Sequence, residues 1–206
     1  MKKIRKGAMR KIYCLFWIFF LPLNLFSQQI ENPLNKLNYS ERIQERVNQG
    51  EIISYSIVEY QEDKKIQSFE VYGVGYHKRT CKVAMRKLSA YENYPNYLSI
   101  INKSTYDEKK KIINFQISPP ILSNDIDVYI KIDRIKDKGN YPFQFASGFF
   151  TALKGNIELT DYNNKCLFHV TAAWSGAYSD IPSPILKIFL EVIIKTGLEN
   201  LFRVSS

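Results

Sequence analysis

Residues 184–202 form the feature that most constrains how this chain can fold, because they read as a long helix that is apolar on nearly every side. Ser183 is placed to cap this helix, and Pro184 falls in its first turn. The charged residues recur every four positions with alternating sign, and they are Lys187, Glu191, Lys195 and Glu199. Residues four apart share one face of a helix, so these charges form a single solvated line. We therefore expect other elements to cover most of the remaining helix surface.

Strand-like segments supply the surface that can cover such a helix. Residues 52–60 and 69–74 are rich in β-branched and aromatic residues, and the polar turn between them predicts a hairpin. Thr80 opens a helix whose apolar residues recur at helical spacing until Pro95 breaks it. Further strands are predicted at roughly 98–106, 111–118, 126–134, 143–150, 153–160 and 165–174. Their short, turn-like connections favour antiparallel neighbours.

The order of these elements predicts one α+β domain, in which an antiparallel sheet covers the long helix. A single sheet curved around the helix satisfies this requirement, and such a sheet often leaves a cavity between the two. Residues 28–50 are expected to form a polar lead-in followed by a short helix, which Ser40 caps and Gly50 ends. The main domain then spans residues 51–206.

The first 27 residues read as a secretory signal. Residues 1–11 carry six basic side chains and no acidic one, and they run directly into the apolar stretch 12–26. This stretch is interrupted by Pro22 and Asn24 and is shorter than the roughly 20 apolar residues that a membrane-spanning helix needs. We expect cleavage after Ser27 and export to the periplasm or the extracellular space. An uncleaved signal that anchors the protein in the membrane is the alternative.

Removal of this signal lowers the net positive charge of the chain. The full chain has 29 basic and 20 acidic residues, and loss of the six basic residues leaves 23 against 20, a net charge of +3. The high isoelectric point therefore comes mainly from the export signal, and we expect no nucleic-acid partner.

The two cysteines that remain after cleavage, Cys81 and Cys166, are candidates for a disulfide, because an exported protein meets an oxidising compartment. The sequence alone leaves open whether their Cα atoms approach within about 7 Å. A zinc site built from His77, Cys81, Cys166 and His169 is disfavoured. Cys166 and His169 are three apart on a predicted strand, so their side chains point to opposite faces. We expect no metal.

Three segments, residues 87–98, 155–159 and 181–186, occur in an order and at a spacing that match a known superfamily. The first reads Lys-Leu-Ser-Ala-Tyr-Glu-Asn-Tyr-Pro-Asn-Tyr-Leu, the second Gly-Asn-Ile-Glu-Leu and the third Ile-Pro-Ser-Pro-Ile-Leu. They resemble, in turn, the helix-to-strand passage, the glycine-led central strand and the start of the closing helix of START-like, polyketide-cyclase and coenzyme-Q-binding proteins. The resemblance covers residues 51–203.

This resemblance implies a helix-grip fold, in which a curved antiparallel sheet of about seven strands wraps around the C-terminal helix and encloses a tunnel. An extra helix and strand would precede it at the N-terminus. Members of the superfamily bind or carry lipids, quinones, sterols or polyketides, and a minority are enzymes. Function varies widely on this fold, so the resemblance does not identify a ligand.

Aromatic and apolar side chains are the candidates for lining such a tunnel. They are Tyr94, Tyr97, Phe115, Tyr129, Phe143, Phe145, Trp174, Phe189 and Ile193. Most aromatic residues of a domain simply fill its core. The sharper hypothesis is that some contact a ligand, with the hydroxyls of Tyr94, Tyr97 and Tyr129 binding its polar end.

No motif of nucleophilic catalysis or of phosphate binding occurs in the chain, and we expect no cofactor. The leading hypothesis is an exported, monomeric, non-catalytic protein that binds or carries a hydrophobic small molecule or lipid. A cyclase- or hydrolase-type enzyme on the same fold is the first alternative, and a protein-interaction domain with a vestigial cavity is the second. The three lysines at 109–111 are the basis for expecting transient membrane contact.

Overall fold

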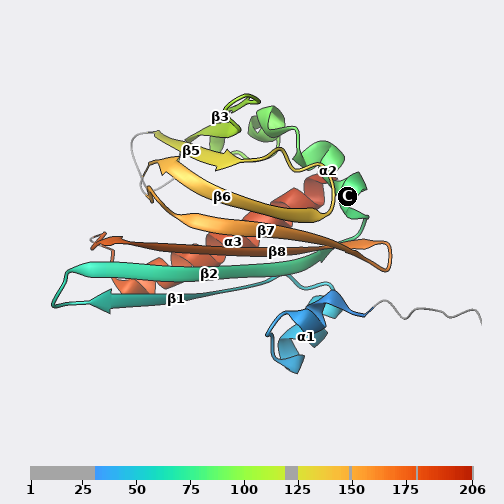
Figure 1. The fold of residues 1–206 in the computed structure, drawn as a ribbon, viewed down its shortest axis with the longest axis horizontal. Coiled ribbons are helices and arrows are strands. Elements are labelled where there is room, and N and C mark those ends of the chain that lie inside the picture. Colours follow the sequence, from blue (N-terminus) through green and yellow to red (C-terminus); the bar gives the residue numbers. More distant parts are fainter. Residues whose placement is uncertain (1–30, 119–124, 149, 180, 206) are drawn as a thin grey trace, which may run out of the picture. The chain divides into compact units, whose positions relative to one another are not determined.

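A curved antiparallel sheet partly encloses one long C-terminal helix, α3 (Ser183–Ser205), in the computed structural model (Figure 1). In the described part of the chain the sheet has eight strands, in the order β1-β2-β8-β7-β6-β5-β4-β3. They are β1 (Ile53–Gln61), β2 (Ile66–His77), β3 (Ile101–Asp107), β4 (Ile112–Ile117), β5 (Ile126–Ile132), β6 (Gly139–Ser147), β7 (Lys154–Tyr162) and β8 (Lys165–Ala177). The predicted α+β fold with a curved antiparallel sheet is confirmed.

The structure describes residues 31–118, 125–148, 150–179 and 181–205, which all belong to the unit Glu31–Ser206. The predicted export signal, residues 1–27, lies outside the described residues. No described helix has the length and apolar character needed to cross a membrane.

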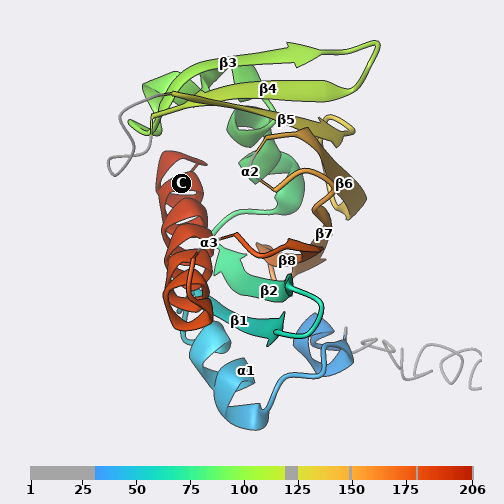
Figure 2. The ribbon, with the colours of Figure 1, turned by 90° about the vertical axis from the view of Figure 1, so that its left-hand side faces the viewer.

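The side chains of the paired strands β2 and β8 point alternately to the two faces of the sheet. These long strands pair from Ile66 opposite Ala177 to His77 opposite Cys166. Because successive strand residues point to opposite faces, one set of side chains faces α3 and the other set faces away. We call the face toward α3 the concave face and the other the convex face (Figure 2).

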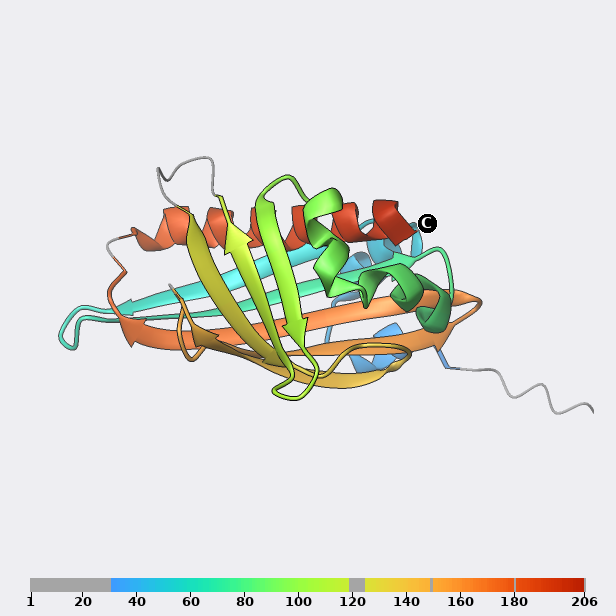
Figure 3. The same ribbon diagram turned by 90° about the horizontal axis from the view of Figure 1, so that it is seen from above.

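Helix α3 lies against one side of the concave face, where it contacts β1 and β2. Strands β1, β2 and β8 run along the helix, whereas β3, β4 and β5 cross its direction (Figure 3). Gly73 permits the close approach, because a Cβ atom there would lie 2.5 Å from Cγ2 of Ile194. Glu191 also holds the helix to the edge strand, since its carboxylate accepts the Ser56 N–H at 2.9 Å.

The expectation that other elements cover α3 on most sides is wrong. One face is buried, with Leu186 fully covered and Leu190 7% exposed. Five apolar residues on the remaining surface are between 41% and 64% exposed, and they are Ile185, Ile188, Phe189, Val192 and Ile193. The physical reason is that α3 lies over β1 and β2, so the sheet covers one face of the helix only.

The N-terminal elements cover part of the convex face. The short 3₁₀-helix η1 (Pro33–Lys36) and helix α1 (Glu41–Asn48) bury Leu34 and Val47 completely against Val74 of β2. The predicted short helix is therefore present, and it ends before Gly50, which has a φ of +95°. The predicted lead-in is not simply a polar tail, because Leu34 anchors it to the sheet.

Helix α2 (Cys81–Leu88) and the 3₁₀-helix η2 (Tyr91–Asn96) fill one end of the concave face. A disulfide joins the first residue of α2, Cys81, to Cys166 of β8, and both are fully buried. Helix α2 ends at Leu88, earlier than the predicted break at Pro95, and this proline lies inside η2. Strand β6 begins at Gly139 rather than at residue 143, because β6 pairs with β7 along residues predicted as a turn.

Candidate functional site

The open part of the concave face lies beside the N-terminal half of α3. An apolar cluster from the sheet and the helix meets there, and it includes Phe69, Val71, Phe143, Phe145, Phe150, Leu153, Ala172, Trp174, Leu186 and Leu190. The ring centroid of Phe69 is 5.6 Å from that of Trp174 and 5.1 Å from that of Phe150. Phe143, Phe145 and Trp174 face inward but are only half-buried. An accessible apolar surface therefore remains under the helix, and we call it the concave site.

Strand alternation and one glycine place these aromatic side chains. Phe143 and Phe145 are two residues apart on β6, so they share the concave face. Phe143 pairs with Gly155 of β7, and a Cβ atom at Gly155 would overlap the Phe143 ring and the Thr171 carbonyl oxygen. The missing side chain at Gly155 is therefore what lets the Phe143 ring lie over β7.

Phe189 and Ile193 lie on α3 beside the concave site. Helical residues follow one another at about 100°, so Phe189 and Glu191 flank Leu190 on opposite sides. Glu191 faces β1, as its hydrogen bond to Ser56 shows. Phe189 therefore faces the open side of the sheet, where it is 41% exposed, and Ile193 follows one turn later with 47% exposure.

The concave side of strands β4 to β8 carries almost no acids or bases. Among the described residues of these strands, Asp161 is the one carboxylate that faces inward, and no lysine, arginine or histidine does so. Its Oδ1 accepts the Cys81 N–H at 2.7 Å, and its Oδ2 lies 4.0 Å from Nζ of Lys138. The described concave side of these strands therefore offers dispersion contacts and no acid–base pair.

The polar groups of the aromatic residues around the site are bound to the backbone. The Tyr94 hydroxyl donates to the Leu88 carbonyl oxygen at 2.8 Å, and burial raises the pKa of Tyr94. The Trp174 indole N–H donates to the Thr151 carbonyl oxygen at 3.2 Å. These bonds satisfy the donors within the protein, so neither group requires a polar ligand atom.

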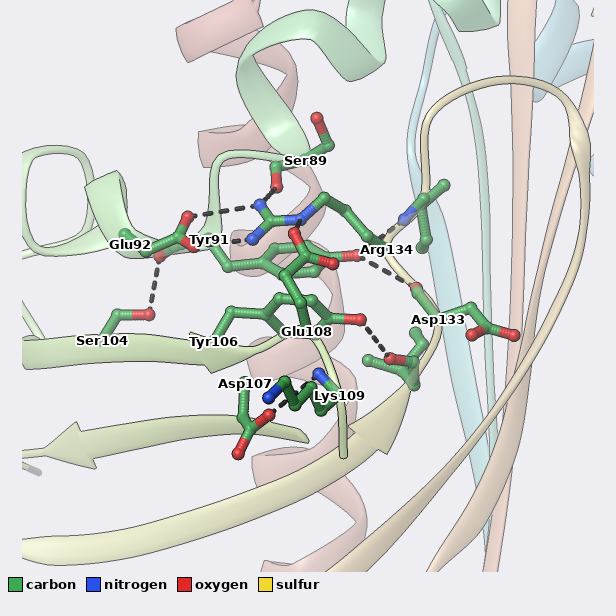
Figure 4. A network of polar contacts seen from close by, with 12 residues as sticks. Ser89, Tyr91, Glu92, Ser104, Tyr106, Asp107, Glu108, Lys109, Asp133 and Arg134 are labelled. Atoms are coloured by element: carbon green, nitrogen blue, oxygen red, sulfur yellow. Dashed lines mark hydrogen bonds and ion pairs between the residues drawn. The ribbon is translucent and has the colours of Figure 1, made fainter. Parts of the chain in front are cut away.

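A network of polar contacts is centred on Arg134 (Figure 4). Its guanidinium lies 2.6 Å from Oε1 of Glu92, on η2, and 2.7 Å from Oε1 of Glu108, on the β3–β4 turn. It also donates to the Ser89 carbonyl oxygen and lies 4.3 Å from the centroid of the Tyr106 ring. Arg134 therefore connects three segments that are distant in sequence.

Electrostatics within this network keep both partners charged. The hydrogen bond to Glu92 raises the pKa of Arg134, and the same bond holds the pKa of Glu92 below its ordinary value. Only 16% of the Arg134 side chain is exposed, so its charge needs these partners. The network positions η2, which carries Tyr94.

The residues predicted to line the tunnel fall into several groups. Phe143, Phe145 and Trp174 belong to the concave site, whereas Phe189 and Ile193 lie among the exposed apolar residues of α3 beside it. Tyr94 and Phe115 instead stack on each other at 5.7 Å at the end of the concave face that α2 and η2 fill, and Tyr97 is half-buried at the end of η2. Tyr129 lies on the convex face.

The placement of Tyr129 corrects the prediction that it lines the tunnel. It pairs with Asn114 of β4, between inward-facing neighbours, and its side chain therefore points away from α3. Phe69 and Phe150 were missed as members of the site. The alternation of Phe69 with Val71 on β2 signals an inward side chain, but its contact with Trp174 depends on the β2–β8 register, which the sequence does not show.

Among the described residues, the four cysteines and histidines considered for a zinc site are divided between the two faces of the sheet. The two cysteine sulfur atoms are bonded to each other, although Cys81, Asp161 and Cys166 lie close together. His77 faces inward at the end of β2, whereas His169 lies on the convex face beside Glu158 of β7.

The convex face has a hollow of its own, with a volume of about 590 Å³. Its lining includes Glu59, Glu70 and Lys154 together with the concave-site residues Phe69 and Trp174. We assign no ligand to the hollow.

Comparison with solved structures identifies the architecture. A START superfamily protein from Mycobacterium smegmatis superposes with a TM-score of 0.54 at 11% identity, over 66% of this chain and 96% of that one. The fold is the START-like helix-grip fold. The ZhuI aromatase/cyclase from Streptomyces sp. R1128 has the same START-like fold, with a TM-score of 0.53 at 8% identity, over 67% of this chain and 93% of that one.

A conserved protein from Geobacillus kaustophilus is also similar, with a TM-score of 0.54 at 14% identity, over 66% of this chain and 94% of that one. No protein family and no curated protein matches the sequence. At these identities the likeness establishes the START-like fold alone, since proteins with this fold differ in function.

Proposed function

We propose that the protein is an exported, non-catalytic carrier that holds a hydrophobic small molecule, such as a lipid, a quinone or a polyketide, in the concave site. The observation that carries this proposal is the pairing of an accessible apolar surface with the absence of inward-facing acids and bases on the described residues of β4 to β8, Asp161 excepted. Apolar surface of this kind gains free energy when a ligand removes it from water.

The same observation favours a carrier over an enzyme. A cyclase or hydrolase needs a proton donor or acceptor within hydrogen-bond reach of its substrate. The nearest inward carboxylate, Asp161, is already bound by the Cys81 amide and lies next to Lys138. Tyr94 and Trp174 donate to backbone carbonyl groups rather than into the site.

The alternative of a protein-interaction domain rests on the exposed face of α3. That face carries Ile188 and Val192, which are 64% and 56% exposed. Because it adjoins the concave site at Phe189, we assign it to transient contact with a membrane that delivers or receives the ligand. The protein would work as a monomer that leaves the membrane with its ligand.

The carrier function can be tested with a pair of substitutions at neighbouring residues. Phe145→Asp places a carboxylate in the concave site, whereas Gln144→Asp places one on the exposed convex side of the same strand. Titration of the mature protein with oleate, a short-chain quinone and an anthraquinone should show binding of at least one probe. Phe145→Asp should weaken this binding at least tenfold, and Gln144→Asp should leave it unchanged.

Native mass spectrometry of the purified protein gives an independent readout, since a carrier retains its ligand through purification. A protein that binds none of the three probes and contains no extractable small molecule would contradict the proposal. Conversion of a bound ligand to a new product would instead favour the enzyme.

Membrane contact and export need separate measurements. Sedimentation with phosphatidylcholine–phosphatidylglycerol vesicles should capture the wild-type protein, and Ile188→Ser with Val192→Ser should reduce the captured fraction.

Light scattering should give the mass of a monomer. N-terminal sequencing of the exported protein should begin at Gln28, and a chain that starts at Met1 in the membrane fraction would favour the anchored form.

A further inference from the structure

A buried histidine connects the last turn of α3 to the sheet. His77 is the final residue of β2 and is 1% exposed. Its Nδ1 accepts the Arg79 N–H at 3.0 Å, and its Nε2 lies 3.2 Å from Oγ of Ser205, the last residue of α3. The imidazole therefore bridges two segments that are 128 positions apart.

The direction of these hydrogen bonds fixes the protonation state of the ring. Nδ1 accepts a backbone N–H, so it carries no proton. Nε2 of the neutral ring then carries the proton and donates to Ser205, and the Ser205 hydroxyl donates onward to the Leu201 carbonyl oxygen at 2.6 Å. A second proton on Nδ1 would cost the Arg79 N–H its acceptor and would face the Arg79 carbonyl oxygen, 3.4 Å away, instead.

The surroundings of His77 also disfavour its charged form. The ring packs edge-on against Phe202 with a centroid distance of 5.4 Å, and Phe168 lies on another side at 6.4 Å. Burial lowers the pKa of His77 below the ordinary value of 6.5, and backbone contacts with Arg79, whose carbonyl oxygen lies 3.4 Å from Nδ1, and with Phe202 oppose this shift only in part. The positive charges of Arg79 and Lys78 lower the pKa further.

The other charged groups at this end of the sheet do not supply a free counter-ion. Lys87 of α2 donates to the Val204 carbonyl oxygen at 2.9 Å, and Arg203 of α3 donates to Asn200. Asp161 of β7 is bound by the Cys81 amide. Ser206 lies outside the described residues.

We propose that His77 is a pH-sensitive latch for α3. At neutral pH the uncharged imidazole fixes the last turn of the helix, Leu201–Ser205, to the end of β2. In mildly acidic solution the second proton goes to Nδ1, and the buried charge that results is hydrated only when the last turn opens, so protonation loosens this end of the helix although Nε2–H can still donate to Ser205. The latch itself does not depend on a ligand, whereas faster ligand exchange at low pH rests on the proposed carrier function.

The sign and size of the effect follow from linkage. A histidine whose pKa is lower in the folded state stabilises that state fully above pH 6.5, and this stabilisation is lost as the pH falls below it. One proton taken up on opening changes the opening equilibrium by at most tenfold per pH unit. Between pH 6.5 and pH 5.0 the opening of the last turn should therefore increase by up to about 30-fold.

Hydrogen exchange of the amides of residues 201–205, corrected for intrinsic rates, tests the latch between pH 7.5 and pH 5.0. Protection should fall with pH in the wild type, and it should become nearly independent of pH in His77→Gln. His169→Gln is the matched control, because His169 lies on the convex face beside Glu158, and this variant should behave like the wild type.

Ring ¹⁵N shifts of His77 provide the second readout, and Ser205→Ala is the variant to use where His77→Gln does not fold. The wild type should show the Nε2–H tautomer at pH 7.5, and Ser205→Ala should have reduced protection at that pH and a shallower pH dependence. Constant protection from pH 7.5 to pH 5.0, or an Nδ1–H tautomer, would overturn the latch. Ligand dissociation is measured separately, so a protein that binds no ligand can still confirm the latch.

Discussion

Reduction of the Cys81–Cys166 disulfide should remove a large share of the stability of the protein. The bond closes a loop with a sequence separation of 85 residues, and the chain-entropy relation for such a loop gives about 4.5 kcal/mol at 25 °C. Small to medium-sized domains are stable by about 5–15 kcal/mol in total, so the loss is a substantial fraction. It should be larger in Cys81→Ala with Cys166→Ala, because both sulfur atoms are fully buried and their removal also leaves a cavity.

Denaturant unfolding of the oxidised protein, of the protein in excess reductant and of the double alanine variant measures this effect. Free energies of unfolding must be compared rather than midpoints, because the open denatured chain is more expanded and has a larger m value. Reductant should have no effect on the double variant. A loss below about 1 kcal/mol in the reduced protein would refute the loop-closure reasoning.

Three further substitutions test contacts that place α3 and η2, each by denaturant unfolding. Gly73→Ala should cost about 1–3 kcal/mol, because the new Cβ would lie 2.5 Å from Cγ2 of Ile194, and an unchanged stability would mean that the helix shifts freely. Gln67→Leu should cost about 2 kcal/mol, since the fully buried amide donates to the backbone just before α3 at 3.0 Å, and Gln67→Glu should not rescue it. Arg134→Met should lower the free energy of unfolding by about 2 kcal/mol. Glu108→Gln, at a carboxylate that is 66% exposed, should lower it by less than about 0.5 kcal/mol. Equal losses would contradict the network described for Arg134.

Much of the fold could be predicted from local patterns. The alternation of Phe143 with Phe145 places both on one face of a strand, and the apolar character of residues 184–202 indicates a helix that packs on a sheet. The strand segments along the chain followed from turn signals. The start of β6 was misplaced, because Gly139 and its neighbours have turn-forming residues but pair with β7.

Less of the candidate site could be predicted, because it depends on register. Phe69 meets Trp174 only because β2 and β8 pair with that alignment, and Tyr129 faces away because of its position relative to β4. A shift of one residue would reverse the face of every side chain on a strand. The sequence shows which side chains of one strand share a face. It does not show which of the two faces packs against the helix.

The sequence by itself determined the elements of this protein and the periodicity of their apolar residues, since propensity and alternation act over a few neighbouring positions. Only the tertiary structure decided that α3 rests on β1 and β2 with an apolar face uncovered, that Cys81 meets Cys166, and that His77 meets Ser205. Each of these pairings joins segments more than 80 positions apart. Their contact results from the curvature of the sheet and the pairing of its strands, which no local pattern specifies.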